Sequence, residues 1–276
     1  MASGQIGNKV RDSVTGIVSG TGDVVAGTVA AVKNALTGAL RGTGDVAKAA
    51  AGAAGDAISG AFEAVGGTTQ SAVSVAKGAA VGVISGIGEV TVVTVGIISD
   101  TVRAGIKGTK DIGVDTADAV AGLAEGAIVA TKDTVISVED AAVGVARGAI
   151  EGARDIGADL AGTARSVVDA VTRGTAEIGG DVIGVVRSTA GGLVTGTGDV
   201  AGDLVDVTRG AIVGAIGAAR DMGLSVEDAA AAAATGALEA AEQIGTRAVD
   251  AVTGVTAETI EGVKIVVKKP FQKSGA

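Results

Sequence analysis

The tetrapeptide Gly-Thr-Gly-Asp occurs three times, beginning at Gly20, Gly42 and Gly196, and it resembles the start of a phosphate-binding loop. Such a loop holds phosphate oxygens with backbone N–H groups and needs a following Lys-Ser/Thr pair to complete the site. No copy is followed by that pair. The three starts are 22 and 154 residues apart, both multiples of 11, so we interpret the tetrapeptide as part of a repeat and not as a nucleotide site.

Pairs of carboxylates spaced four residues apart are the second feature that could do chemistry. On one helix face, two carboxylates at this spacing supply the oxygen ligands that Ca²⁺ prefers. Basic neighbours would instead make the same pairs part of a solvated, salt-bridged surface, which is the interpretation we favour. We therefore expect no metal and no other cofactor. The pairs are Asp111/Asp115, Asp155/Asp159, Glu177/Asp181 and Asp199/Asp203.

Composition narrows the chemistry further. The chain has no His and no Cys, which removes the commonest general base and metal ligand and all thiol chemistry. Its net charge of −9 disfavours nucleic acid as a partner. We expect a protein that is not an enzyme, with no catalytic residue and no small-molecule substrate. The N-terminus lacks the apolar core of a signal peptide, which predicts a cytoplasmic protein, either free or peripheral on a membrane or lipid body.

The elements that must position these residues follow an 11-residue repeat. Cutting the chain from Lys9 gives 24 consecutive rows that end at Gln272 without an insertion. Of the 53 charged residues (22 basic plus 31 acidic), 49 occupy row positions 3, 4, 7, 8 and 11. From about Gly108 onward, Asp-bearing rows alternate with Gly- or Ser-bearing rows, so the larger unit there has 22 residues.

Eleven residues make three turns of a slightly unwound α-helix. In that projection positions 5, 9, 2, 6 and 10 form one apolar face, whereas a β-strand would require strict alternation. Acidic residues concentrate at positions 11, 4 and 8, on another side of the helix, so neighbouring helices could pair a basic strip with an acidic one. The basic strip, at positions 3 and 7 beside the apolar face, includes Arg154, Arg165, Arg187, Arg209 and Arg220.

Glycine recurs at positions 1, 4 and 8, where it forms a stripe that another backbone could approach closely. Gly126, Gly148 and Gly214, all at position 8, represent this predicted helix-packing stripe. The 44 glycines within the rows disfavour an isolated helix by about 35–45 kcal/mol, so the apolar face must lie on something. The candidates are a lipid surface, other copies of the chain, or its own folded-back length. Fold-back normally needs residues that break the phase, and none are found.

The pattern thus predicts an all-α protein: a very long amphipathic helix, or a few long helices, built from 24 uninterrupted repeats and without a compact globular core. Residues 1–8 precede the helical rod, 9–263 form it, and 64–74 are its softest segment. Residues 264–276 form a basic tail that either contacts an anionic surface or closes the helix. Residues 78–99 are long and apolar enough to span a bilayer, but Glu89 falls where the repeat has acids, so we favour an apolar part of the repeat.

Two segments, GTKDIG (108–113) and ATKDTV (130–135), resemble the Lys-Thr-Lys-Glu-Gly-Val repeats of synucleins, with Thr, Lys and acid at matching places. Perilipins and exchangeable apolipoproteins share the 11-residue period. The resemblance implies a long helix lying on a lipid surface. It covers the period throughout but the motif in only a few rows, and this chain is more acidic and richer in glycine than synuclein repeats.

These observations predict a structural protein that self-associates. The first expectation is lateral assembly as a coat or scaffold on a lipid or other apolar surface. The alternative is a lipid-free filament or bundle. A third is an ice- or stress-protective helix, because Thr recurs at position 2 and an ice-facing helix needs such a row. That row comprises Thr21, Thr43, Thr109, Thr131, Thr175 and Thr197.

Overall fold

The computed structural model describes residues 3–18, 23–40, 46–64, 69–110 and 113–267. Within these residues the chain forms twelve α-helices, one 3₁₀-helix and a two-stranded hairpin. In chain order these elements are α1 (Ser3–Val18), α2 (Val24–Leu40), α3 (Val46–Glu63), α4 (Thr69–Gly88), α5 (Val95–Thr109), α6 (Thr116–Val129), η1 (Ala130–Asp133), α7 (Val138–Ile156), α8 (Leu160–Glu177), α9 (Val182–Asp199), α10 (Leu204–Met222), α11 (Val226–Ile244), α12 (Thr246–Thr256), β1 (Thr259–Ile260) and β2 (Val263–Lys264).

The expectation of one very long helix without a core is therefore wrong. The rod predicted for 9–263 is divided into helices of at most 20 residues that pack against each other. Segment 64–74 contains only one of many interruptions, since α3 ends at Glu63 and α4 begins at Thr69. Residues 3–8, expected to precede the rod, belong to α1. Of the basic tail, Lys264 lies in β2, and residues 268–276 lie outside the described part.

The chain reverses within the repeat phase, which is why no residue interrupts the pattern. From α7 to α11 each helix begins 22 residues after the previous one, so one helix and its turn occupy two rows. The turn falls at row position 6 of every second row. Gly157 and Gly223 have φ values of 74° and 66° there, in the left-handed region that favours glycine. In each case the following N–H, of Ala158 or Leu224, reaches back to a helix carbonyl at 2.8 Å.

A polar side chain two residues after each of these turns begins the next helix. Asp159, for example, accepts a hydrogen bond from the backbone N–H of Ala161. Satisfying an otherwise unpaired N–H in the first turn typically contributes about 1 kcal/mol. The N-cap residues are Asp115, Ser137, Asp159, Asp181, Asp203 and Ser225.

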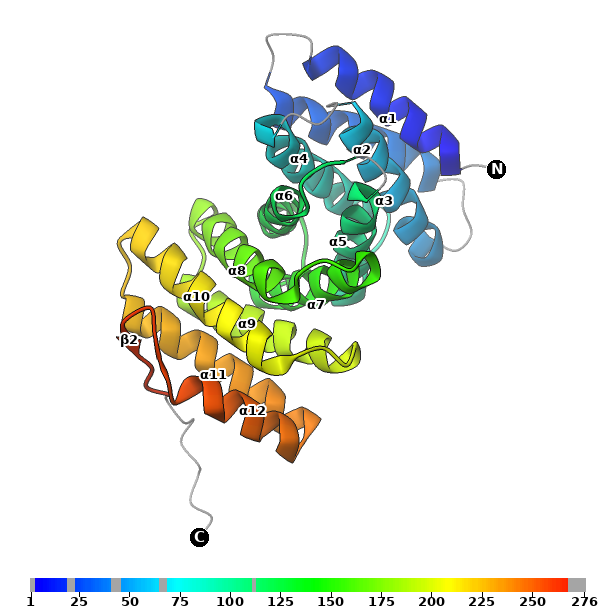
Figure 1. The fold of residues 1–276 in the computed structure, drawn as a ribbon. Coiled ribbons are helices and arrows are strands. Elements are labelled where there is room, and N and C mark those ends of the chain that lie inside the picture. The colour runs from blue at the N-terminus through cyan, green and yellow to red at the C-terminus, as the bar shows by residue number, and fades with distance from the viewer. Residues whose placement is uncertain (1–2, 19–22, 41–45, 65–68, 111–112, 268–276) are drawn as a thin grey trace.

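The helices form two stacked layers. From α1 to α11 each helix packs most extensively against a helix two places away along the chain, so the odd-numbered helices form one layer and the even-numbered helices the other. Figure 1 shows the stack running from α1 at the N-terminal end to α11, α12 and the β-hairpin at the C-terminal end. Stacking of helix pairs with a 44-residue repeat is the arrangement of an α-solenoid.

The core lies between the two layers and continues along the stack. Its largest fully buried side chains come from helices throughout the chain, including Phe62, Leu36, Ile84, Leu123, Ile150 and Leu193. The apolar row positions thus bury their side chains against neighbouring helices of the same chain. This intramolecular packing offsets the low helix propensity of the glycines, and no outside surface is needed for it.

The apolar segment 78–99 covers most of α4, a turn and the start of α5. Glu89, at the end of α4, forms an ion pair with Lys33 of α2, with Nζ and Oε1 2.7 Å apart. Among the described helices, none combines the length and apolar character needed to cross a membrane. The segment is part of the solenoid core.

Candidate binding groove

The carboxylate pairs do not lie on one helix face, because a turn separates the two members. In the pair Asp155/Asp159, Asp155 accepts a hydrogen bond from Arg103 at 2.8 Å, while Asp159 caps α8. The pairs Glu177/Asp181 and Asp199/Asp203 divide in the same way between an ion pair and a cap. Asp115 caps α6, and its predicted partner Asp111 lies outside the described residues. Across the described chain no group of three potential ligands could hold a metal ion.

The glycines of the predicted packing stripe lie at close approaches between helices of the same layer. A side-chain carbon added to Gly214 of α10 would lie 2.6 Å from the carbonyl oxygen of Arg165 in α8. Gly126 of α6 similarly lies against the backbone of Lys77 in α4, and Gly148 of α7 against Ser99 in α5. Any side chain there would push neighbouring helices of one layer apart. These contacts are all within one chain.

The basic strip is also used largely within the chain. Arg187 of α9 pairs with Glu239 of α11, and Arg209 of α10 pairs with Glu258. Arg220 donates to the backbone carbonyl of Glu261, which ties the β-hairpin to α10. Arg154 and Arg165 are exposed. The pairing of basic with acidic strips therefore occurs between helices n and n+2 of one chain.

Lys77 links three helices of the even layer. Its ammonium lies 2.9 Å from Glu125 of α6 and 2.6 Å from Glu177 of α8. Burial alone would lower the pKa of Lys77, but the hydrogen bonds to Glu177 and Glu125 outweigh burial, and the pKa is raised. Lys77 therefore stays charged and holds α4, α6 and α8 together.

The threonine row considered for ice contact is not on the surface. Thr109, Thr131, Thr175 and Thr197 are buried, and each hydroxyl donates to a backbone carbonyl three or four residues earlier. The other two members, Thr21 and Thr43, lie outside the described residues. The four described threonines thus satisfy their hydroxyls locally inside the core.

The described copy of the Gly-Thr-Gly-Asp tetrapeptide also has a structural role. Gly196 lies in the last turn of α9 against the backbone of Arg147, and Asp199 forms an ion pair with the Arg147 guanidinium at 2.9 Å. The segments that resemble synuclein repeats fall at helix ends, since α5 ends at Thr109 and Ala130–Asp133 form η1. Neither segment continues a long helix.

A trough crosses the odd layer along α9. The outward side of α9 carries small residues at helical spacing, Gly184, Ser188, Gly191 and Thr195. Two hollows of about 500 Å³ and 470 Å³ share Gly184 and Arg187 and so join along the helix. Glu139 and Val143 of α7 form one wall, and Glu239, Ala240 and Gln243 of α11 form the other. The remaining lining of the smaller hollow comes from the first turns of α9 and α11.

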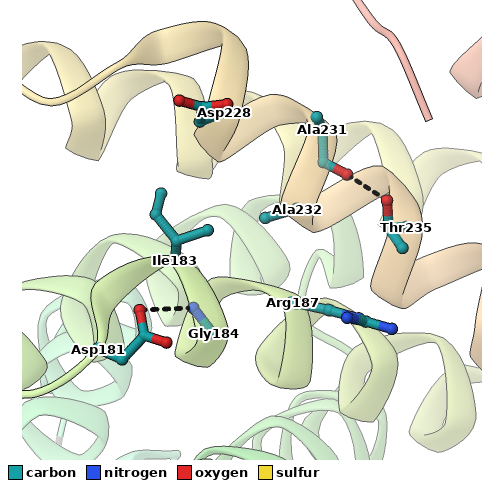
Figure 2. A pocket seen from close by; sticks show the side chains of 8 residues that line it. All are labelled: Asp181, Ile183, Gly184, Arg187, Asp228, Ala231, Ala232 and Thr235. Atoms are coloured by element: carbon teal, nitrogen blue, oxygen red, sulfur yellow. Dashed lines mark hydrogen bonds between the residues drawn. The ribbon is translucent and has the colours of Figure 1, made fainter. Parts of the chain in front are cut away.

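Figure 2 shows the smaller hollow between the two helices. Asp181 accepts from the backbone N–H of Gly184 at 3.1 Å, so this carboxylate is held at the start of α9. The Thr235 hydroxyl donates to the Ala231 carbonyl at 2.6 Å and is already satisfied. Ile183 adds an apolar side chain that is 37% exposed. The hollow is thus lined by two carboxylates, Asp181 and Asp228, and by mainly small residues between them.

The charges around the trough are mostly negative. Four carboxylates line it, against the single guanidinium of Arg187. Arg187 Nε lies 2.8 Å from Glu239 Oε2, and this hydrogen bond raises the pKa of the guanidinium. Because Glu239 neutralises Arg187, Glu139 and Asp181 leave the trough with a net negative charge.

Sequence reasoning identified Arg187 but missed the trough around it. The signal was present as a difference between repeats: the small residues Gly191 and Thr195 of α9 correspond, 44 residues earlier, to Arg147 and Glu151 of α7. A helix with short outward side chains between two helices with longer ones leaves a channel. That signal becomes readable only once the 44-residue repeat is known.

No family model matches the chain, and no curated protein matches it. The function must therefore be argued from the site itself.

Proposed function

We propose that this protein is a non-catalytic helical-repeat scaffold that binds a basic, extended polypeptide segment in the trough along α9. The observation that carries the proposal is the negatively charged channel with a floor of small residues. Solenoids commonly present their ligand sites on such extended surfaces. This proposal replaces the coat and filament expectations, which depended on a long helix with an uncovered apolar face.

The dimensions of the trough suit a short peptide. From Gly184 to Thr195 the helix advances about 17 Å, which an extended peptide covers with about five residues. The floor lets a peptide backbone approach closely, and the carboxylates on the walls favour Lys or Arg side chains. The chain as a whole, with a net charge of −9, also attracts a basic segment over a longer range.

Binding of a fluorescein-labelled Lys-Gly-Lys-Gly-Lys peptide, measured by fluorescence anisotropy, tests the proposal. We expect saturable binding that weakens with salt, and no binding of the matched peptide with Glu in place of Lys. Ser188→Trp should abolish binding by filling the channel. Equal binding of the two peptides, or unchanged binding to Ser188→Trp, would refute the trough as the site.

The sequence offers a matched control for charge. Glu139 and Glu227 occupy the same place in two identical segments, SVEDAA at 137–142 and 225–230, and both are exposed, but only Glu139 lines the trough. Glu139→Gln should weaken peptide binding by up to about fivefold, corresponding to an exposed charge contribution of up to about 1 kcal/mol. Glu227→Gln should have a smaller effect.

A further inference from the structure

The N-terminal end of the stack carries an uncovered helix face. On α2 the residues Ala26, Ala30, Asn34 and Gly38 are exposed and follow one another at four-residue spacing. A hollow of about 760 Å³ lies between this stripe and α1, and another of about 540 Å³ lies between it and Glu89 at the end of α4. The face is thus a ridge of short side chains with a depression on each side.

The equivalents of Gly38 in later helices of the even layer are Gly82, Gly126 and Gly214, and each of them packs against a neighbouring helix. Gly82 of α4 lies against the backbone of Val29 in α2, with 2.8 Å between an added Cβ and the carbonyl oxygen. Gly126 and Gly214, each a multiple of 44 residues further along, make the corresponding contact. Gly38 stands 44 residues before Gly82, yet a Cβ added there would meet no atom of the described residues within 4 Å. The interface that joins helices inside the chain therefore continues, unoccupied, on α2.

The odd layer also has an unoccupied packing position at the N-terminal end of the stack. Gly60 of α3 lies against the backbone of Gly7 in α1, whereas a Cβ added to Gly16, 44 residues before Gly60, would meet no helix of the described residues within 4 Å. The C-terminal end is different, because α12 packs on α10 and α11, and β2 packs on α11. Ile265, which follows the hairpin, is buried as well. A head-to-tail stack of chains would need an open face at both ends, and the described C-terminal end is covered.

Charge on the N-terminal face is self-complementary. Lys9 and Asp12 lie one turn apart on α1 and both line the larger hollow. The Asp12 side chain is 75% exposed, and its Oδ1 lies 3.5 Å from Arg11 Nε at the edge of this face. If two copies meet through this face about a two-fold axis, Lys9 of each copy can meet Asp12 of the other.

We propose that the α1–α2 face binds the same face of a second copy and forms a two-fold symmetric dimer. The glycine stripe permits close approach of the two α2 helices, and the hollows on both sides receive the flanking side chains. This surface is formed by α1 and α2, away from the trough between α7, α9 and α11, so it shares no residue with the proposed peptide site.

Sedimentation equilibrium of the full chain tests the dimer. The parent should show twice the chain mass of 26.0 kDa at micromolar concentration, and Gly38→Arg should sediment as a monomer. Gly254→Arg is the control, since Gly254 is exposed on α12 with nothing within 4 Å of an added Cβ; it should remain dimeric. A monomeric parent, or a dimeric Gly38→Arg with unchanged circular dichroism, would overturn the proposal.

Because the chain has no cysteine, a single introduced thiol reports the symmetry. Asn34→Cys lies in the middle of the α2 stripe and should form a disulfide-linked dimer under mild oxidation, at least tenfold faster than Gly254→Cys. Equal cross-linking rates for the two variants, or ladders of higher oligomers, would contradict a two-fold dimer through α2.

Discussion

Asp56 lies where burial disfavours the ionised form of its carboxyl group. Its Oδ2 atom is buried without a hydrogen-bond partner among the described residues, and burial raises the pKa of the carboxyl above its ordinary value. The equivalent residue is Asp100 after 44 places but Gly144 and Ala232 after 88 and 176 places, so not every repeat needs a carboxylate at this position.

We predict that Asp56→Ala increases the free energy of unfolding at pH 7 by about 1–2 kcal/mol, because it removes an unsatisfied buried oxygen. A raised folded-state pKa means that folding favours the protonated carboxyl. The loss of stability caused by the ionised Asp56 carboxylate is therefore largest above its folded-state pKa, and it disappears below the unfolded-state pKa of about 3.9. In urea titrations the advantage of the variant should shrink as the pH falls from 7 towards 4. A variant less stable than the parent at pH 7 would show that Asp56 has a stabilising partner.

The element of this fold is a 22-residue unit made of one helix and one turn. Its helix is held in place by close approach to the helix two units earlier, as with Gly148 on the backbone of Ser99. Its turn is formed by a left-handed residue followed by an N-cap, as with Gly157 and Asp159. Glycine therefore serves two separate purposes within one unit.

We predict opposite effects for leucine at two helical glycines. Gly148→Leu should lower the free energy of unfolding by about 1–3 kcal/mol or more, because the side chain meets the backbone of α5. Gly217→Leu on α10 meets nothing within 4 Å and should raise it by up to about 1 kcal/mol through helix propensity. Thermal unfolding followed by circular dichroism measures both. A stabilised Gly148→Leu would mean that α5 and α7 are not in close contact there.

The sequence predicted that the chain is helical and which side of each helix is buried, because the period of the apolar residues shows which side of a helix is apolar. The reversals were not recognised, since the turn at Gly157 keeps the 11-residue phase and looks like one more row. A glycine followed two residues later by a capping Asp159 is a stop and start signal that was available. The trough was beyond sequence reasoning, because it depends on which helices flank Gly191, and that follows only from the order of stacking.

At the scale of the whole molecule, the stack is a series of helix pairs with a 44-residue period. Each pair contacts mainly the pairs before and after it, so stability accumulates along the stack. Cross-helix ion pairs repeat at separations of 48 and 52 residues, as in Arg103 with Glu151 and Asp155. The repeat that matters for folding is therefore 44 residues, although the repeat visible in the sequence is 11.

Two deletions distinguish these periods. Removing 138–181 takes out α7, α8 and the turn after α8, and it joins the cap Ser137 to the start of α9; we expect a shorter chain that still unfolds cooperatively. Removing 138–170 preserves the 11-residue phase but leaves only a fragment of α8 between two turns. That variant should lose helix content and cooperativity, measured by circular dichroism during urea unfolding. Equal behaviour of both deletions would make the 11-residue row the structural unit.

The short reach of these contacts bears on how the chain acquires its structure during synthesis. A ribosome adds about 5–20 residues per second, so a new helix pair emerges every few seconds, whereas helices form within about a microsecond. Each pair finds its packing surface already made by the pair that emerged before it. The stack therefore grows in the order of translation, and α12 with the hairpin closes it last. The bridge from Lys77 to Glu177, across 100 residues, forms only after two further pairs have emerged.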